Sequence, residues 1–292
     1  IDAGTTWQTP INGSEALSGA EVCDCCPSEI ILNGSEQALL FRDNNANLRD
    51  IWACFSTDGG GSFPIGGDVD DADWLVNVCP SSGAHGAFIN NSFYMVWMTG
   101  ASGTSKVMIT TVDKSNANST TNWEMPGVPQ GGQNFPRIAG EGNTIGVVYQ
   151  EYISGSPGQE CYFAYTFDGD SKLDSLTLLN AQSLGSQSNP DLVFADGVFH
   201  FVYQNSYTGG VTYRTAIVGS VGVNEVNKTI SIFPNPAVNE IKLEGASNSK
   251  IHILNQLGEI ILIKNVYNEK ESIDCSQFAT GTYFIQVIQK NL

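Results

Sequence analysis

Long apolar runs and positive charge are what this 292-residue sequence most clearly lacks. No stretch of about 18 apolar residues occurs, so the sequence predicts no helix that spans a membrane. Only 13 lysines and arginines stand against 30 aspartates and glutamates, which gives a formal net charge of −17. A chain this acidic is not expected to bind a nucleic-acid backbone or an anionic membrane surface.

Common catalytic signatures are absent as well. The sequence contains no Gly-rich phosphate loop, no Ser–His–Asp arrangement and no H-E-x-x-H motif. No secretory signal stands at Ile1, although a mature chain would already have lost one. Helical periodicity is also scarce, whereas short apolar runs rich in β-branched and aromatic residues lie between glycines. The expected fold class is therefore all-β.

A turn motif recurs along the first 170 or so residues. The stretch FSTDGGGSF has the spacing S-x-D-x-G-x-x-F, formed by Ser56, Asp58, Gly60 and Phe63. The spacing suits a β-hairpin turn, because the carboxylate can accept backbone N–H groups and glycine adopts positive φ. Aspartates recur in steps of 56, 55 and 55 residues, at Asp2, Asp58, Asp113 and Asp168. The first of them is followed in register by Gly4 and Trp7.

Two apolar strands are predicted in each repeat. The first strand of each repeat is expected in ALLFRDN, FYMVWMTG, TIGVVYQEY and VFHFVYQNS. The second strand is expected in DIWACFST, SKVMITTV, CYFAYTFD and VTYRTAIV. A strand, a loop, a second strand and a turn make up most of a propeller blade. The motif resembles the Asp-box of sialidase-like β-propellers, which implies such a propeller over residues 1–222. The four visible repeats either close a four-bladed ring or belong to a longer ring whose start is missing.

The character of the chain changes after residue 222. Residues 223–228 are expected to form a linker, and residues 229–292 contain short alternating strands that predict a small antiparallel β-sandwich. This segment resembles the type A C-terminal sorting domain of the type IX secretion system of Gram-negative bacteria. The resemblance rests on the N-x-x-G-E turn at Asn255 and on the motif residues Phe233, Pro234, Asn235, Pro236, Gly281 and Tyr283.

The resemblance implies export to the cell surface, with the type IX translocon, an outer-membrane shuttle and a sortase-like peptidase as partners. One further short basic strand is usual after the G-T-Y strand of such domains, and the sequence stops at Leu292 instead. An ordinary accessory sandwich without a sorting role is the alternative.

Cysteines gather near the N-terminus, in VCDCCPSEI and in NVCPSSGAHG. In an oxidising compartment these four, Cys23, Cys25, Cys26 and Cys79, are expected to form two disulfides with unknown connectivity. The alternatives are a reactive thiol, or a zinc or copper site that also uses His85. The other three cysteines, Cys54, Cys161 and Cys275, leave at least one unpaired thiol, and the first two fall in strand patterns typical of buried residues.

A sialidase needs an arginine triad that holds the substrate carboxylate. The only candidates for that role among four arginines are Arg42, Arg137 and Arg214, and the F-R-I-P motif of the family is missing. The acidic loop GGDVDDADW is either solvated or a calcium site formed by Asp68, Asp70, Asp71 and Asp73. Trp74 is a candidate for stacking on a sugar ring, whereas Trp97 is expected to pack in the core.

These patterns favour an exported surface protein whose propeller is a non-catalytic binding or adhesion domain for a glycan or another surface component. A sialidase-like glycoside hydrolase using the three arginines is one alternative. A structural protein of cell-surface assemblies is the other. No cofactor is expected apart from the possible calcium.

Overall fold

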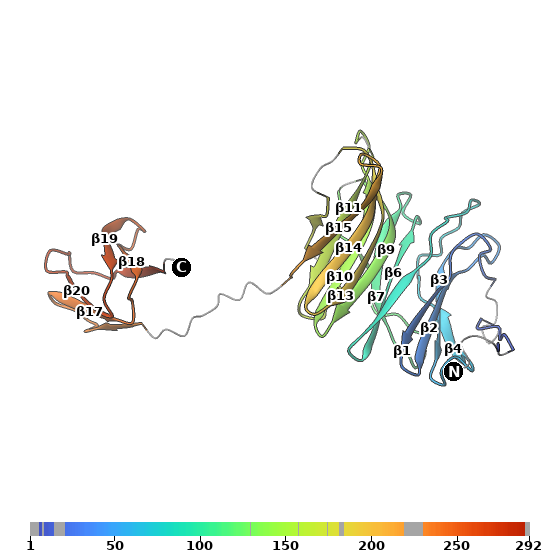
Figure 1. Ribbon diagram of the computed structural model, residues 1–292, viewed down its shortest axis with the longest axis horizontal. Coiled ribbons are helices and arrows are strands. Elements are labelled where there is room, and N and C mark those ends of the chain that lie inside the picture. The colour runs from blue at the N-terminus through green and yellow to red at the C-terminus, as the bar shows by residue number, and fades with distance from the viewer. Residues whose placement is uncertain are drawn as a thin grey trace. The chain divides into compact units, whose positions relative to one another are not determined.

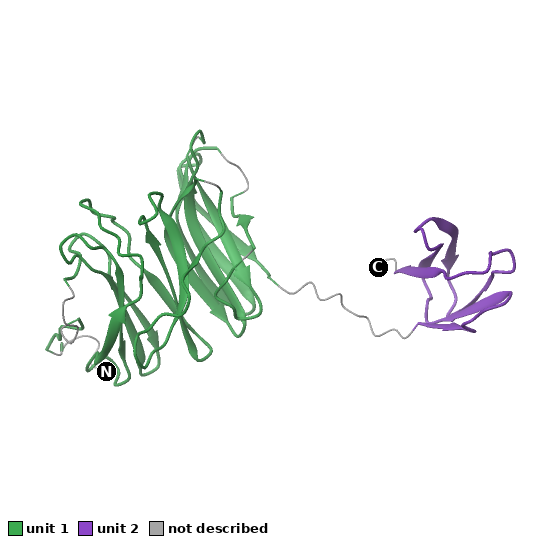
Figure 2. Cartoon of the chain, turned by 180° about the vertical axis from the view of Figure 1, so that it is seen from behind, with its two compact units in different colours: residues 1–220 green, residues 221–292 purple. Residues whose placement is uncertain are grey.

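In the computed structural model, residues 6–7, 9–14, 21–128, 130–156, 158–173, 175–180, 184–218 and 230–289 are described. Asp2 and Gly4 and the expected linker at 223–228 lie outside these residues. The all-β expectation is confirmed, since the described residues form strands and turns without a helix. Consequently no helix among them could cross a membrane. The chain divides into two compact units, residues 1–220 and 221–292 (Figure 2).

The first unit contains antiparallel sheets that follow one another in chain order (Figure 1). Three of them have four strands and one has three. The first sheet is β1 (Glu29–Asn33), β2 (Glu36–Arg42), β3 (Ile51–Ser56) and β4 (Ile65–Asp68). The second is β5 (His85–Ile89), β6 (Ser92–Thr99), β7 (Lys106–Val112) and β8 (Trp123–Glu124). The third is β9 (Gly132–Glu141), β10 (Thr144–Tyr152), β11 (Gln159–Thr166) and β12 (Thr177–Leu178). The last is β13 (Gln187–Ala195), β14 (Val198–Asn205) and β15 (Gly210–Ala216).

The middle sheets are buried on both faces, because successive strand residues point to opposite sides. On β6, Met95 and Trp97 pack towards the first sheet, whereas Tyr94 and Val96 pack towards the third. This arrangement accounts for the unbroken apolar run of that strand. Such runs are the sequence mark of a strand covered on two faces.

Among the described residues, the last sheet is covered on one face only. On β14, Phe199, Phe201 and Tyr203 are buried against the third sheet. Val202, which alternates with them, is 40% exposed, and Tyr213 on the neighbouring strand is 61% exposed. No core cluster of the described residues joins this sheet to the first one, so the sheets form an open series there.

Each first strand joins its second strand through a tight turn. Gly34-Ser35, Asn90-Asn91, Gly142-Asn143 and Asp196-Gly197 occupy these turns, with positive φ at Gly34, Asn90, Gly142, Asp196 and Gly197. Asn and Gly tolerate this conformation, which hairpins of two loop residues require. These turn residues are the signal that would have revealed the strands β1, β5, β9 and β13, which the sequence analysis did not predict.

The second unit consists of two three-stranded antiparallel sheets around one core. One sheet holds β16 (Ser231–Phe233), β17 (Glu240–Glu244) and β20 (Lys270–Asp274), and the other holds β18 (Ser249–Leu254), β19 (Ile260–Val266) and β21 (Phe284–Gln289). The Asn255 side chain builds the turn before β19, since its Oδ1 accepts the N–H groups of Leu257 and Glu259 at 2.9 and 3.0 Å. Gly258 follows with φ +82°.

Candidate functional site

The sheets of the first unit have two ends with different roles. Because neighbouring strands are antiparallel, the β2–β3, β6–β7, β10–β11 and β14–β15 loops share one end with the connections between sheets. The turns that carry Asp58, Asp113 and Asp168 follow the third strand of a sheet and lie at the opposite end. We call the end with the connections between sheets the loop end. It carries the four clustered cysteines, Trp74 and a group of buried charges.

The aspartate turns use their carboxylates for local structure. Asp58 Oδ1 accepts the Ser56 hydroxyl at 2.7 Å and the Ser62 N–H at 3.0 Å, and the Gly60 N–H donates to Ser56 Oγ at 3.0 Å. Asp113 Oδ1 accepts the Ser115 N–H, and Asp168 Oδ1 accepts the Thr166 hydroxyl and the Asp170 N–H. These bonds lower the pKa of all three carboxyl groups, that of Asp58 to about 2.

The structure corrects the expected role of Trp7 as the aromatic residue of the first turn. Trp7, which the spacing placed in register with Phe63, is 91% exposed and so does not pack beneath a turn. Phe63 is half-buried and lines a shallow pocket with Ile11 and Pro64. The described residues of this segment, 6–7 and 9–14, belong to no strand that could provide a packing surface.

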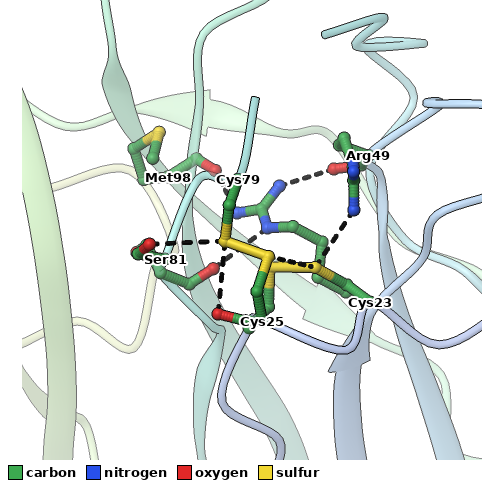
Figure 3. The surroundings of a disulfide bond; sticks show 9 residues. Cys23, Cys25, Arg49, Cys79, Ser81 and Met98 are labelled. Carbon is green, nitrogen blue, oxygen red and sulfur yellow. Dashed lines mark hydrogen bonds between the residues drawn. A yellow bond between two sulfur atoms is a disulfide. The ribbon is translucent and has the colours of Figure 1, made fainter. Parts of the chain in front are cut away.

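Two disulfides lie at the loop end, Cys23–Cys26 and Cys25–Cys79 (Figure 3). The four sulfur atoms all lie within 4.8 Å of one another. The sheet positions their segment, because the Cys23 N–H donates to the Arg42 carbonyl at 2.8 Å and Val22 bridges Asp43. Cys54 and Cys161 are buried elsewhere, and burial raises the pKa of both thiols to about 12.

His85 does not belong to this sulfur cluster, contrary to the alternative of a metal site that also uses His85. It begins β5, and its Nδ1 accepts the Ile138 N–H at 3.2 Å. Burial, together with the charge of Arg137, lowers the pKa of His85 to about 4. A neutral imidazole that already accepts a backbone hydrogen bond serves to join β5 to β9.

The buried guanidinium of Arg42 joins three backbone segments. Its Nε donates to Ser82 O at 3.0 Å, Nη1 to Arg49 O at 2.5 Å and Nη2 to Met98 O at 2.6 Å. Arg42 is 1% exposed, and its guanidinium carbon lies 5.3 Å from the centre of the Trp74 ring. Burial lowers the pKa of Arg42 to about 10, so the group stays charged at neutral pH. A side chain used in this way cannot clamp a substrate carboxylate.

The other two candidate arginines lie in other sheets. Arg137 stands in the middle of β9, with its Nε 3.8 Å from Asp191. Arg214 lies on β15 and donates to the Leu179 carbonyl. The expected triad of Arg42, Arg137 and Arg214 is therefore wrong, because the three guanidinium groups serve separate structural contacts.

The carboxylates of the acidic loop do not converge on one point. Asp68 Oδ1 accepts the Asp70 N–H at 3.1 Å, and Asp71 Oδ1 accepts the Asn122 side chain at 2.8 Å. Within the described part of the chain, the four cysteines are the only group of three or more metal-ligating side chains close enough to share an ion. The expected calcium site at Asp68, Asp70, Asp71 and Asp73 is thus not formed.

Asp70 is the buried member of this loop, at 2% exposure. Burial and the nearby charge of Asp50 raise its pKa from 3.8 to about 7, although Arg42 acts in the opposite direction. A carboxyl whose pKa is higher in the folded than in the unfolded chain favours folding at low pH. That contribution is complete below the unfolded value of 3.8 and is lost as the pH rises through about 7.

Asp70→Asn should therefore reduce the loss of stability on going from acidic to slightly alkaline pH. Urea denaturation at about pH 4.5 and about pH 8 measures this effect as the difference between the two midpoints, for wild type and variant. Asp71→Asn, at an exposed position on the same loop, is the matched control. An unchanged pH dependence in Asp70→Asn would contradict the assignment.

The connection between the first two sheets, residues 69–84, is held in place along its backbone. Asp50 Oδ1 accepts the Trp74 N–H at 2.9 Å, the Arg49 N–H donates to Trp74 O at 2.8 Å and the Val76 N–H donates to Asn47 O at 3.0 Å. The Trp74 ring is half-buried between Arg42 and Gly100, whereas Trp97 is fully buried and packs in the core. Leu75 and Val78 remain 72% and 65% exposed.

The first strands of the four sheets line a second feature, an open pocket of about 420 Å³. Its lining includes Asn33 from β1, His85 from β5, Ala139 from β9 and Asp191 from β13. None of these strands was predicted from the sequence, so this meeting of four strands was missed.

Comparison with known proteins identifies the C-terminal segment. Residues 231–292 match the family model described as the secretion system C-terminal sorting domain. The Phe233-Pro234 and Asn235-Pro236 peptide bonds in this segment are cis. Tyr283 packs on Phe278 and donates to the Ala279 carbonyl at 2.7 Å, and Gly281 lies in the preceding turn region. No curated protein matches the chain.

Solved structures resemble the chain weakly. A thermostable family-43 glycoside hydrolase shares 13% identity at a TM-score of 0.40, covering 89% of this chain and 91% of its own. The endo-arabinase from Bacteroides thetaiotaomicron shares 10% identity at a TM-score of 0.41, and the match covers 67% of this chain and 75% of the endo-arabinase. PorZ is described as an essential bacterial surface component of the type-IX secretion system of Porphyromonas gingivalis. It shares 12% identity at a TM-score of 0.34, and the match covers 89% of this chain and 36% of PorZ.

These structures are glycoside hydrolases and a secretion component, so they do not single out sialidase-like proteins. Likenesses at TM-scores of 0.41 and below carry no conclusion about activity. The assignment of the chain rests on the sorting domain. Residues 231–292 are a secretion system C-terminal sorting domain of the type IX system, and the chain is a protein exported to the cell surface or the extracellular space.

Proposed function

We propose that the first unit is a non-catalytic binding domain, which the sorting domain delivers to the cell surface. The observation that carries the proposal is the connection 69–84. Its backbone is held by hydrogen bonds and by the Cys25–Cys79 disulfide, yet it presents Leu75 and Val78 to solvent. Apolar side chains on a rigid loop mark an interaction surface, because little conformational entropy remains to be lost on binding.

Loops of the third and last sheets at the same end add aromatic surface. Tyr152, at the end of β10, is 52% exposed, and Tyr207, in the β14–β15 loop, is 61% exposed. Aromatic rings of this kind suit a glycan, since an apolar ring face and a polar hydroxyl together complement a sugar. The half-buried Trp74 supports the loop from below. A glycan or another surface component is therefore the proposed ligand class.

Hydrolysis has less support in this unit. The guanidinium of Arg42 donates to three backbone carbonyl oxygens, and Arg137 and Arg214 lie in other sheets. A fluorogenic sialoside should therefore not be turned over. Turnover that is abolished by Arg137→Ala would overturn this view.

The double variant Leu75→Ser/Val78→Ser should weaken binding at least about tenfold, which corresponds to about 1.4 kcal/mol. The measurement is a glycan array followed by titration of the best ligand, with immobilised cell-surface material as a second probe. Val193→Ser/Val211→Ser removes comparably exposed valines from the last sheet and should leave binding unchanged. Equal losses in both variants would contradict the assignment of the surface.

A further inference from the structure

We propose that Cys23, Cys25, Cys26 and Cys79, once reduced, bind one zinc-class cation as a tetrathiolate site. The loop end would then have two closed states, one with two disulfides and one with a metal ion. This inference goes beyond the binding function of the loop end.

The positions of the sulfur atoms are the first argument. All four lie within 4.8 Å of one another, and Cys23 Sγ is 3.5 Å from Cys25 Sγ across the two disulfides. A tetrahedral zinc site with Zn–S bonds of about 2.3 Å needs sulfur atoms about 3.8 Å apart. Small side-chain rotations that separate the bonded pairs would therefore produce the required tetrahedron.

The two segments that carry the cysteines are also held together without their disulfides. Cys23 is tied to β2 by its N–H bond to the Arg42 carbonyl at 2.8 Å. Arg42 reaches across to the Ser82 carbonyl at 3.0 Å, three residues beyond Cys79. Gly83 packs so closely on Pro27 that an added Cβ would lie 2.2 Å from the Pro27 carbonyl oxygen. Reduction would thus leave the four thiols near one another.

An unmatched cation beside the sulfur atoms is the second, independent argument. Arg49 is 7% exposed, and its Nη1 donates to Cys23 Sγ at 3.1 Å (Figure 3). Its Nε is buried without a hydrogen-bond partner, and Arg49 forms no ion pair with any residue that the structure describes. A disulfide sulfur is neutral and accepts weakly, whereas a thiolate carries the charge that this guanidinium lacks.

The charge of the metal-bound state fits these surroundings. Four thiolates around a divalent cation carry a net charge of −2, which buried surroundings tolerate only beside positive groups. Arg49 contacts Cys23 directly, and Arg42 lies behind the same segment. The Ser81 hydroxyl, 3.3 Å from Cys79 Sγ, offers a further hydrogen bond to a ligating thiolate. Such outer contacts orient ligands and stabilise their charge.

The conversion balances with a reductant of the phosphine or dithiol class. Two equivalents of a dithiol reduce both S–S bonds to four thiols and are oxidised to two cyclic disulfides. The divalent cation then binds the four sulfur atoms, and four thiol protons pass to solvent. Metal affinity should therefore rise with pH.

The experiment uses the full chain, reduced with a phosphine under anaerobic conditions, freed of reductant and titrated with Zn²⁺ or Cd²⁺. Native mass spectrometry should show one metal ion per chain, and Cd²⁺ should give an ultraviolet thiolate-to-metal band. Bound metal should protect Cys23, Cys25, Cys26 and Cys79 from alkylation. Cys275→Ser, outside the cluster, should bind as wild type does.

Two variants distinguish the site from adventitious binding. Cys79→Ser should abolish the four-sulfur spectrum. Arg49→Gln leaves all four ligands in place and should weaken the affinity by about 10–100-fold. If the reduced chain unfolds, recovery of its tryptophan fluorescence on adding metal supports the proposal. Failure to bind one equivalent of metal, failure to refold with metal, or unchanged binding in Cys79→Ser overturns it.

Discussion

Replacing Arg42 with methionine is expected to lower the free energy of unfolding of the first unit by about 3 kcal/mol or more. The substitution fills similar space but removes every donor to the carbonyl groups of Ser82, Arg49 and Met98. Three buried acceptors would then lack partners, and each such loss costs about 1–3 kcal/mol. The connection to the second sheet and the β2–β3 loop would lose their common anchor.

Urea denaturation followed by tryptophan fluorescence measures this effect in the intact chain. All five tryptophans lie in the first unit, so the signal does not report on the sorting domain. Arg137→Met is the matched control, because its side chain is 35% exposed and its ion pair with Asp191 is long, at 3.8 Å. That variant should lose no more than about 1 kcal/mol. Equal losses in the two variants would show that Arg42 is not the anchor.

Removing the Cys25–Cys79 disulfide is expected to have the second large effect. This bond closes a loop with a sequence separation of 54, and the double variant Cys25→Ser/Cys79→Ser should lose about 4 kcal/mol by the chain-entropy estimate. The Cys23–Cys26 bond has a separation of only 3, and its double variant should lose about 2 kcal/mol by the same estimate. The difference arises in the unfolded chain, which gains more freedom when the longer loop opens.

Denaturation under non-reducing conditions gives both values, and alkylation with mass analysis verifies the remaining disulfide in each variant. The reverse order, with the greater loss in Cys23→Ser/Cys26→Ser, would contradict the pairing. Cys275→Ser controls for the effect of replacing a cysteine outside both bonds. Glycan or surface binding measured on the same variants would show whether the longer loop must be closed for the loop end to recognise a ligand.

Several expectations from the sequence depended on local chemistry and agree with the structure. The β-branched and aromatic content of the apolar runs predicted strands, and β2, β3, β6 and β7 lie where those runs occur. The turn residues around Asp58 predicted a local hydrogen-bond network, and Ser56, Gly60 and Ser62 supply it. Motif spacing in the last 60 or so residues predicted a sorting domain, which the family model matches.

The candidate site was less accessible from sequence, because its chemistry depends on burial. In the sequence, Arg42 resembles a ligand-binding arginine and Asp70 resembles a calcium-binding aspartate. Only the packing of β6 and the connection 69–84 around them makes Arg42 a structural anchor and raises the pKa of Asp70. The exposure of Leu75 and Val78 likewise follows from which backbone groups of their loop find partners.

By itself, then, the sequence determined the all-β class, the acidic character, the turns and the sorting domain, because period-2 alternation, turn chemistry and motif spacing act over a few residues. Tertiary structure alone decided which cysteines pair, which arginines are buried and which end of the sheets presents an apolar loop. Those outcomes require residues far apart in the chain, such as Cys25 and Cys79 or Arg42 and Met98, to meet through sheet packing.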